Sequence, residues 1–147
     1  MAVSNLSDAD VARGVIGRWT PANVTVKLHE VEWDVTRSVN GPGEFSIEFK
    51  YDRGLHRLDL KWVALVVDGS EVDRDTHNGT TGGRHSNNTY VVSLRAYDPD
   101  ARYVLRARVR SDGGSDSYGT IRILDRNQQT ATGVSPLFIN YSAGVPN

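Results

Sequence analysis

The sequence predicts an all-β fold, a two-sheet antiparallel β-sandwich of about eight strands with a short helical segment near the N-terminus. Segments with apolar residues at every second position recur along the chain, and turns rich in Gly, Asp and Asn separate them at steady spacing. Helical spacing of apolar residues is confined to one short stretch. The 147 residues suit one domain, with a core over about residues 17–124 and a C-terminal extension over 125–147.

The helical segment is predicted within residues 7–17. Ser7 stands where an N-cap residue accepts a backbone N–H, acidic residues follow it, and a glycine ends the helix at one of two positions. A turn is expected next, over residues 17–21, because Pro21 holds the residue before it extended. Trp19 is expected to pin this turn onto the sheet.

Two stretches in the first third of the chain alternate between polar and apolar residues. Residues 23–36 do so with an irregularity near His29, so one bent strand and two separate strands are both open. Residues 44–51 form the cleanest half-buried strand, with aromatic and aliphatic side chains inward and charged side chains outward.

The central element of the predicted sandwich is the strand that starts at residue 57. Its first part alternates, and residues 62–67 are apolar on both sides, which is typical of a strand covered on both faces. The dipeptide Asp68-Gly69 then suits a two-residue hairpin turn, so the chain should fold back at once. Because a turn over residues 52–54 precedes this strand, we expect it to pair with residues 44–51 as a hairpin.

Two polar loops interrupt the second half of the chain, over residues 73–88 and 111–119. Loops of this length usually serve a function or are mobile. The remaining segments are expected to be strands, over residues 89–94, 102–110, 120–124 and 136–141.

The composition argues against several functional classes. Lysine plus arginine (17) nearly equals aspartate plus glutamate (18), so a net charge of -1 gives no support for nucleic-acid binding. Cysteine is absent, which excludes a disulfide framework and a thiolate metal site. No apolar stretch has the length of a membrane span, so no membrane partner is expected. Phosphate loops, dinucleotide fingerprints and nucleophile elbows are also absent.

The two polar loops are the predicted functional surface. A sugar offers an apolar C–H face and a rim of hydroxyls, so an aromatic ring exposed beside polar side chains suits it. Trp19, Trp33 and Tyr118 are the candidate rings, with Trp33 and Tyr118 preferred, and core packing is the competing explanation for each. The candidate polar contacts are Asp75, His77, Asn78, Arg84 and Asp116.

Calcium is a further possibility in the second loop, because Asp112 and Asp116 supply the hard oxygen ligands that this ion prefers. The first loop does not fit the helical calcium motif, since Arg84 stands where a bidentate carboxylate is required. Capping of their own turns is the competing explanation for these aspartates. Zinc is not expected with four histidines and no cysteine, and no other cofactor is predicted.

Four motifs resemble a known family: residues 32–36 (Glu-Trp-Asp-Val-Thr), 54–60, 75–82 and 110–119. They look like the C-terminal β-sandwich modules appended to bacterial β-N-acetylhexosaminidases and related glycoside hydrolases, and the resemblance covers about residues 17–124. It implies an accessory module without catalytic residues, because the active site of such proteins belongs to a separate barrel domain. The implied partner is a glycan or a neighbouring catalytic domain, and the implied location is extracellular or periplasmic. Residues 125–147 depart from the family's pattern.

Two other hypotheses stay open. A structural or oligomerisation module would use the loops and a basic stripe to dock a neighbouring domain or an identical subunit. That stripe consists of Arg106, Arg108 and Arg110, and its simpler interpretation is a solvated face paired with acids of a neighbouring strand. A small hydrolase or lyase would instead use His77 with Arg84 and an acid.

Overall fold

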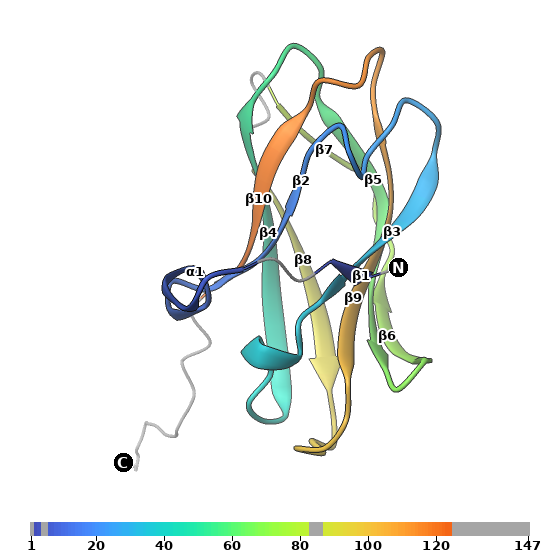
Figure 1. Cartoon of the computed structure of the whole chain (residues 1–147). Helices are drawn as coiled ribbons and strands as arrows, with labels where there is room; N and C mark the ends of the chain where they lie inside the picture. The colour runs from blue at the N-terminus through green and yellow to red at the C-terminus, as the bar shows by residue number, and fades with distance from the viewer. Residues whose placement is uncertain (1, 4–5, 83–86, 125–147) are drawn as a thin grey trace.

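Two β-sheets face each other in the computed structural model, which describes residues 2–3, 6–82 and 87–124 (Figure 1). The first sheet has the order β1 (Ala2–Val3), β3 (His29–Asp34), β9 (Tyr103–Ser111), β5 (Leu58–Val67) and β6 (Ser70–Asp75), with β7 (Gly79–Thr81) also paired to β5. The second sheet has the order β2 (Val15–Trp19), β10 (Tyr118–Ile123), β4 (Gly43–Arg53) and β8 (Asn87–Leu94).

The predicted two-sheet sandwich is therefore confirmed. Among the described strands only β1 and β3 pair in parallel, and the other pairings are antiparallel. The described part of the chain has more strands than the eight expected, because β1 and β7 are too short to leave an alternating pattern in the sequence.

A short helix, α1 (Asp8–Ala12), lies inside the predicted helical segment, and Ser7 caps it by accepting a backbone N–H at 3.0 Å. The predicted turn over residues 17–21 is wrong, because β2 already occupies most of it. The Trp33 indole packs so closely on Gly17 that a Cβ there would lie 2.5 Å from the ring. This glycine therefore marks a close contact between strands, which the sequence alone does not distinguish from a turn.

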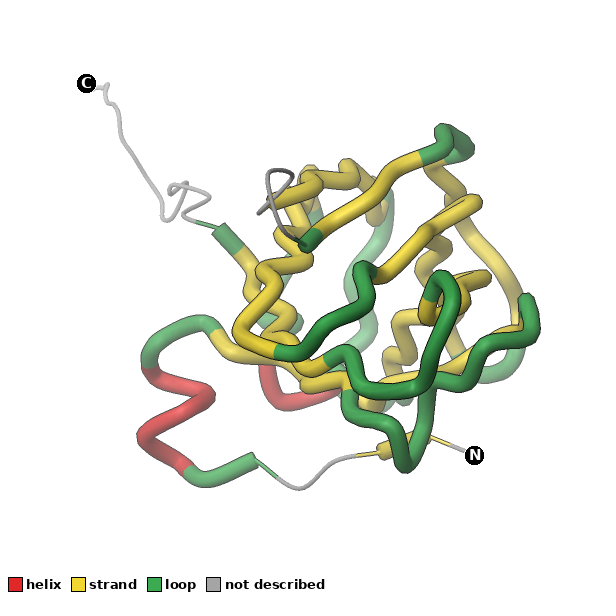
Figure 2. Tube along the Cα trace, turned by 90° about the horizontal axis from the view of Figure 1, so that it is seen from above, coloured by secondary structure: helices red, strands yellow, loops and turns green. Residues whose placement is uncertain are grey.

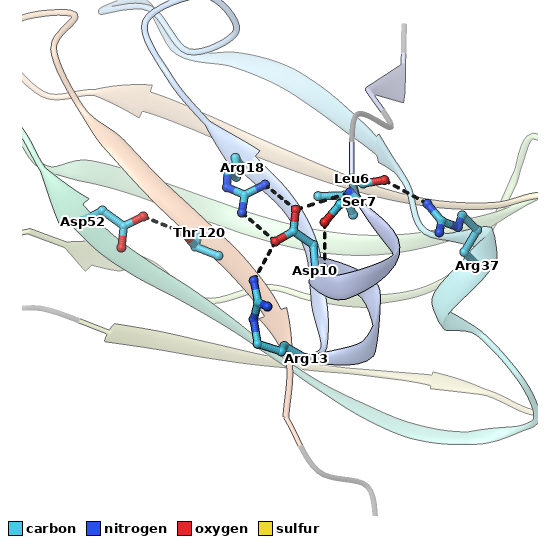
Figure 3. A network of polar contacts seen from close by, with 8 residues as sticks. All are labelled: Leu6, Ser7, Asp10, Arg13, Arg18, Arg37, Asp52 and Thr120. Carbon is cyan, nitrogen blue, oxygen red and sulfur yellow. Dashed lines mark hydrogen bonds and ion pairs between the residues drawn. The ribbon is translucent and has the colours of Figure 1, made fainter.

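The N-terminal segment is fastened to both sides of the sandwich (Figure 3). On one side the Asp10 carboxylate of α1 accepts hydrogen bonds from Arg18 of β2, the closer at 3.1 Å. On the other side Arg37, in the 3-10 turn η1 (Thr36–Ser38) that follows β3, donates to the Leu6 carbonyl at 3.0 Å. The N-terminal segment thus bridges β2, at the edge of the second sheet, and the turn that follows β3 of the first sheet.

The core between the sheets is organised around Phe49 of β4. Its ring centroid lies 6.0 Å from those of Trp19 and Trp33 and 5.9 Å from that of Tyr90, and all four side chains are fully buried. The rings come from both sheets, so their contacts join the two layers. Trp19 also donates from Nε1 to the Ser117 hydroxyl at 2.9 Å, so it does pin its segment as expected.

β5 is the central strand that the sequence predicts, with β9 on one side and β6 and β7 on the other. Its outward-facing residues Trp62, Ala64 and Val66 lie outside the core cluster yet are only 9%, 0% and 2% exposed. The guanidinium carbon of Arg74 lies 3.8 Å from the Trp62 ring centroid. The Arg74 side chain therefore covers Trp62 on the outer face, where its long apolar stem can lie on an apolar surface.

The predicted turn between β5 and β6 is confirmed. Asp68 has a φ of 48° and Gly69 a φ of 87°, and both central residues of this kind of hairpin turn require a positive φ.

The predicted hairpin between residues 44–51 and the central strand is wrong. β4 pairs with β8 and β10 in the second sheet, whereas β5 lies in the first. The turn over 52–54 leads into a crossing between sheets, with Gly54 at a φ of 116°. Turn chemistry specifies that the chain changes direction, but it does not specify in which sheet the chain continues.

Two further segments differ from the prediction. Of the strand or strands expected over residues 23–36, only β3 forms, and the Thr25 carbonyl instead accepts the N–H of Ser111 outside the sheet ladders. Much of the loop expected over residues 73–88 is strand, because β6 extends into it, β7 lies within it and β8 begins before it ends. The side chains there are polar, and backbone pairing with β5 does not require apolar ones.

The later strands follow the prediction more closely. β8, β9 and β10 overlap residues 89–94, 102–110 and 120–124, and Tyr103, Leu105, Ala107 and Val109, which share one face of β9, are buried. The strand expected over 136–141 and the extension over 125–147 lie outside the described residues.

Candidate functional site

The two predicted functional loops occupy different parts of the molecule. Residues 112–117 join β9 to β10 at the end of the sandwich where β4 also connects to β5 (Figure 1). We call this the loop end, and Figure 2 looks onto it from above. Residues 76–78 instead join β6 to β7 along the edge of the first sheet, beside β8.

Asp116 fastens the two connections of the loop end together. Its carboxylate accepts the backbone N–H groups of Leu55 at 2.9 Å and of His56 at 3.0 Å, and it lies 2.7 Å from His56 Nδ1. Because an ionised carboxylate only accepts hydrogen bonds, Nδ1 carries the proton in this pair. The His56 ring and the two N–H donors together outweigh desolvation and hold the pKa of the Asp116 carboxyl below its usual value.

The position of the His56 ring requires glycine in the same loop. A Cβ at Gly114 would lie 2.4 Å from His56 Cε1, and Gly113 has a φ of 93°. The pair therefore lets the β9–β10 connection close over the imidazole, which no larger residue would permit at position 114.

Four charged side chains form a closed ring beside this loop. Arg57 and Arg110 each donate from Nε to the Asp59 carboxylate at 3.1 Å, and Arg57 also lies 3.1 Å from Asp112. Arg110 completes the ring at 3.6 Å from Asp112. Asp59 is nearly buried, so its charge depends on these partners. The charges neutralise one another, which is the arrangement of a structural network.

Tyr118 supplies an aromatic surface at the loop end. The guanidinium carbon of Arg53 lies 3.7 Å from its ring centroid, and the ring is half-buried. Leu55, at the tip of the β4–β5 connection, is 88% exposed. The loop end therefore combines an immobilised ring, an exposed apolar side chain and the partly exposed Asp116 carboxylate.

A second cluster lies at the β6–β7 connection. The His77 ring stacks on Tyr90 with centroids 3.9 Å apart and planes 14° from parallel, and His77 Nδ1 lies 2.9 Å from the Asp75 carboxylate. The other oxygen of Asp75 accepts the Val91 N–H at 2.8 Å. Asn78 is exposed beside these residues.

Protonation in this cluster follows from burial and charge. Burial opposes ionisation of Asp75, but the hydrogen bonds from His77 and from the Val91 N–H outweigh it, so the pKa of this carboxyl is lowered. Burial, aided by the nearby Asp75 charge, raises the pKa of the Tyr90 hydroxyl. Tyr90 therefore stays neutral and donates from its hydroxyl to the His77 carbonyl at 3.1 Å.

The structure divides the sugar site that the sequence predicts. Asp116 and Tyr118 lie at the loop end, whereas Asp75, His77 and Asn78 lie at the β6–β7 connection, and Arg84 lies outside the described residues. Trp33 as a stacking surface is wrong, because its ring is fully buried against Phe49.

Trp19 is likewise fully buried, so core packing explains both tryptophans. His56 and Arg53 also belong to the loop end, although the sequence does not predict this. Their partners, Asp116 and Tyr118, lie in the β9–β10 connection and at the start of β10, and no local pattern marks a contact over that separation.

The basic stripe on β9 is a face whose arginines pair with acids of neighbouring strands, which is the simpler of the two interpretations of the sequence. Arg106 donates to Glu32 at 2.8 Å, Arg108 lies 3.8 Å from Glu30, and Arg110 binds Asp59. These arginines pair with acids of the neighbouring strands β3 and β5.

Within the described ranges, no group of three or more His, Cys, Asp or Glu side chains could hold a metal ion. Asp112 and Asp116, the two calcium candidates, each have cationic or N–H partners at their carboxylates. Calcium binding there would have to displace these contacts.

One cavity of about 420 Å³ lies beside Trp33, under the N-terminal segment. Leu6, Gly17 and Ala22 line it together with the polar residues Thr20 and Asn23. Trp33 forms the inner wall, but its indole N–H already donates to the Arg18 carbonyl at 2.9 Å and the ring has no exposed surface.

Comparison of the sequence with protein-family models and with curated proteins finds no match. Among the residues that the structure places, no helix is long and apolar enough to cross a membrane.

Proposed function

We propose that the chain is a non-catalytic carbohydrate-binding or accessory β-sandwich module, and that a glycan binds at the loop end beside Tyr118. One observation carries this proposal. The half-buried Tyr118 ring is held by Arg53, and two residues earlier in the chain the Asp116 carboxylate is fixed by three contacts while its side chain remains 40% exposed. A ring and a hydroxyl-binding carboxylate held in place before binding lose little freedom when a sugar docks.

The charged side chains beside the loop end pair with one another, as in a structural network. Arg57, Asp59, Arg110 and Asp112 neutralise one another, and the His77 ring is fixed by Asp75 on one edge and Tyr90 on one face. A general acid or base needs a proton-transferring group within reach of a substrate. His77 keeps its second ring nitrogen for that role, so an activity assay on wild type and His77→Ala tests the hydrolase alternative.

The test is a glycan array followed by calorimetry on the full chain, with and without calcium. Tyr118→Ala should weaken binding of the best array glycan about tenfold, because it removes the stacking surface. His77→Ala serves as the matched control, since it removes an exposed ring from the other cluster. Glycan affinity that is absent under both conditions, or unchanged in Tyr118→Ala, would contradict the proposal.

Leu55 favours a second candidate function, docking of a neighbouring domain or an identical subunit at the same end. An aliphatic side chain that is 88% exposed at a loop tip is suited to an apolar partner. Light scattering that finds a stable oligomer in the wild-type chain and a monomer in Leu55→Asn would favour this function over sugar binding.

A further inference from the structure

The chain contains two Asn-Gly dipeptides, Asn40-Gly41 and Asn78-Gly79, and the fold places them in different surroundings. In such a pair the backbone nitrogen of the glycine can attack the asparagine side chain, because glycine has no Cβ to shield that nitrogen or to restrict the backbone around it. The attack needs an accessible side-chain amide, a glycine N–H without a hydrogen bond, and room for a ring to close. The surroundings of each pair therefore decide whether it reacts.

Asn40 and Gly41 lie in the connection between η1 and β4, outside any helix or strand. This connection is at the end of the sandwich opposite the loop end (Figure 1). Asn40 is exposed, and neither its side chain nor the Gly41 N–H has a hydrogen-bond partner among the residues that the structure describes. A Cβ placed on Gly41 would meet nothing within 4 Å. Ring closure between these two residues is therefore unhindered.

The fold restrains the second pair. Asn78 is also exposed, but Gly79 is buried and begins β7, where it pairs with Leu60 of β5. A Cβ on Gly79 would lie 2.5 Å from the Tyr90 hydroxyl and 2.9 Å from Asn88 Oδ1. Ring closure requires the Gly79 backbone to turn, and the strand pairing and this close packing oppose that movement.

We propose that Asn40 is a site of spontaneous deamidation, whereas β7 protects Asn78. Hydroxide removes the N–H proton of Gly41, the nitrogen forms a bond to Asn40 Cγ, and the Cγ–Nδ2 bond breaks as ammonia leaves with a proton from water. Water then opens the succinimide ring, at Cγ to give aspartate or at the backbone carbonyl carbon to give isoaspartate. The net reaction turns one amide and one water into a carboxylic acid and ammonia, without oxidation or reduction.

The products change the η1–β4 connection. A carboxylate replaces a neutral amide, so the net charge of -1 becomes more negative by one unit. Isoaspartate also carries the backbone through Cβ and Cγ, which lengthens the link between the buried Val39 and β4. The connection is remote from the loop end, so the inference does not depend on the proposed glycan binding.

Trypsin separates the two sites, because each lies in a peptide with no other Asn or Gln. Residues 38–50 contain Asn40, and residues 75–84 contain Asn78. The folded full chain is incubated in mildly alkaline buffer made with heavy-oxygen water, quenched in acid and digested for mass spectrometry. The heavy oxygen marks conversion during the incubation. We expect Asn40 to convert at least about tenfold faster than Asn78, with aspartate and isoaspartate forms that elute separately.

Gly41→Ala is the matched variant for the reacting site, since the added Cβ fits the open space and shields the nitrogen. It should keep wild-type stability and slow the conversion of Asn40 at least about tenfold. In guanidinium chloride the unfolded wild-type chain should convert both asparagines at similar rates, because the two dipeptides are the same.

Several results would overturn the proposal. They are equal rates at the two sites in the folded chain, faster conversion at Asn78, or a rate at Asn40 that Gly41→Ala leaves unchanged. An Asn40 that converts only in the unfolded chain would show that the η1–β4 connection protects it. A difference between the sites that persists in guanidinium chloride would show that neighbouring residues, and not β7, protect Asn78.

Discussion

The carboxylate of Asp73 on β6 accepts the backbone N–H of Ser93 on β8 at 2.7 Å, so a side chain of one sheet caps the edge of the other. Two residues along each strand, Asp75 caps the Val91 N–H in the same way at 2.8 Å. An edge strand with free N–H groups invites pairing with a further chain. The two aspartates therefore protect the edge of β8 and tie the sheets together along their open side.

Removing one cap should cost measurable stability. Asp73→Ala leaves the Ser93 N–H without its charged acceptor, and we expect the free energy of unfolding to fall by about 1–2 kcal/mol. Urea denaturation checks this, and hydrogen exchange should speed up at Ser93. Asp100→Ala, at an exposed position between β8 and β9, should change stability by less than about 0.5 kcal/mol. Unchanged stability and an equally protected Ser93 amide in Asp73→Ala would refute the capping role.

Gly119 is predicted to be intolerant of a side chain. A Cβ there would lie 2.0 Å from Trp19 Cη2 in the buried core, so Gly119→Ala must displace the indole. We expect a loss of about 2–3 kcal/mol in thermal or urea unfolding and a changed near-ultraviolet circular dichroism. Gly41→Ala is the control, because a Cβ at that position meets nothing within 4 Å. A Gly119→Ala variant as stable as Gly41→Ala would show that the packing there is loose.

The contact between Asp10 and Arg18, which holds α1 against β2, should persist at acid pH. Hydrogen bonds from Arg18, assisted by Ser7, outweigh desolvation and lower the pKa of Asp10 to about 2. A group whose pKa is lowered on folding stabilises the folded state above its unfolded pKa, so this contribution is complete above roughly pH 4. It is lost only as the pH falls through about 2.

NMR titration of the Asp10 carboxyl measures this directly. Arg18→Gln should move its pKa upward, towards the ordinary value of 3.8 for an aspartate, because the principal donor is gone. Arg102→Gln, which removes a partner of Asp34 instead, should leave the Asp10 titration as it is. An unaltered titration in Arg18→Gln would mean that Arg18 does not lower this pKa.

Asp116 is expected to control the order of the loop end. Asp116→Ala frees the N–H groups of Leu55 and His56, so we expect a loss of stability and faster proteolysis within residues 54–57. Since the pKa of Asp116 is lowered on folding, the same loosening should appear in the wild type only at a pH below the usual range of a carboxyl. Ser115→Ala, at an exposed position in the same connection, should be cleaved at the wild-type rate.

Features that local chemistry decides were predictable from the sequence. The Asp68-Gly69 turn needs two positive φ values, the Ser7 cap needs a hydroxyl, and the run at 62–67 needs cover on both faces. Each is visible within a few neighbouring residues. The structure reproduces all three.

Features that depend on distant partners were not predictable. The crossing after β4 looks like a hairpin turn because its residues satisfy the same backbone requirements. Burial of Trp33 depends on Gly17 and Phe49, and the role of His56 depends on Asp116. One sequence shows which side chains are aromatic or charged, but it does not show which of them meet across the sandwich.

The passage of the chain from one sheet to the other after β4 also bears on how the protein folds. Both strands that pair with β4, β8 and β10, lie in the second half of the chain. β9, which pairs with β5, also lies there. Contacts between residues so far apart close large loops before they bring any stabilisation, which slows folding to about milliseconds to seconds. A ribosome must therefore release nearly the whole of the described region before either layer is complete, and a fragment of residues 1–80, which keeps the β5–β6 hairpin but lacks β8, β9 and β10, should show much less sheet signal in circular dichroism than the full chain.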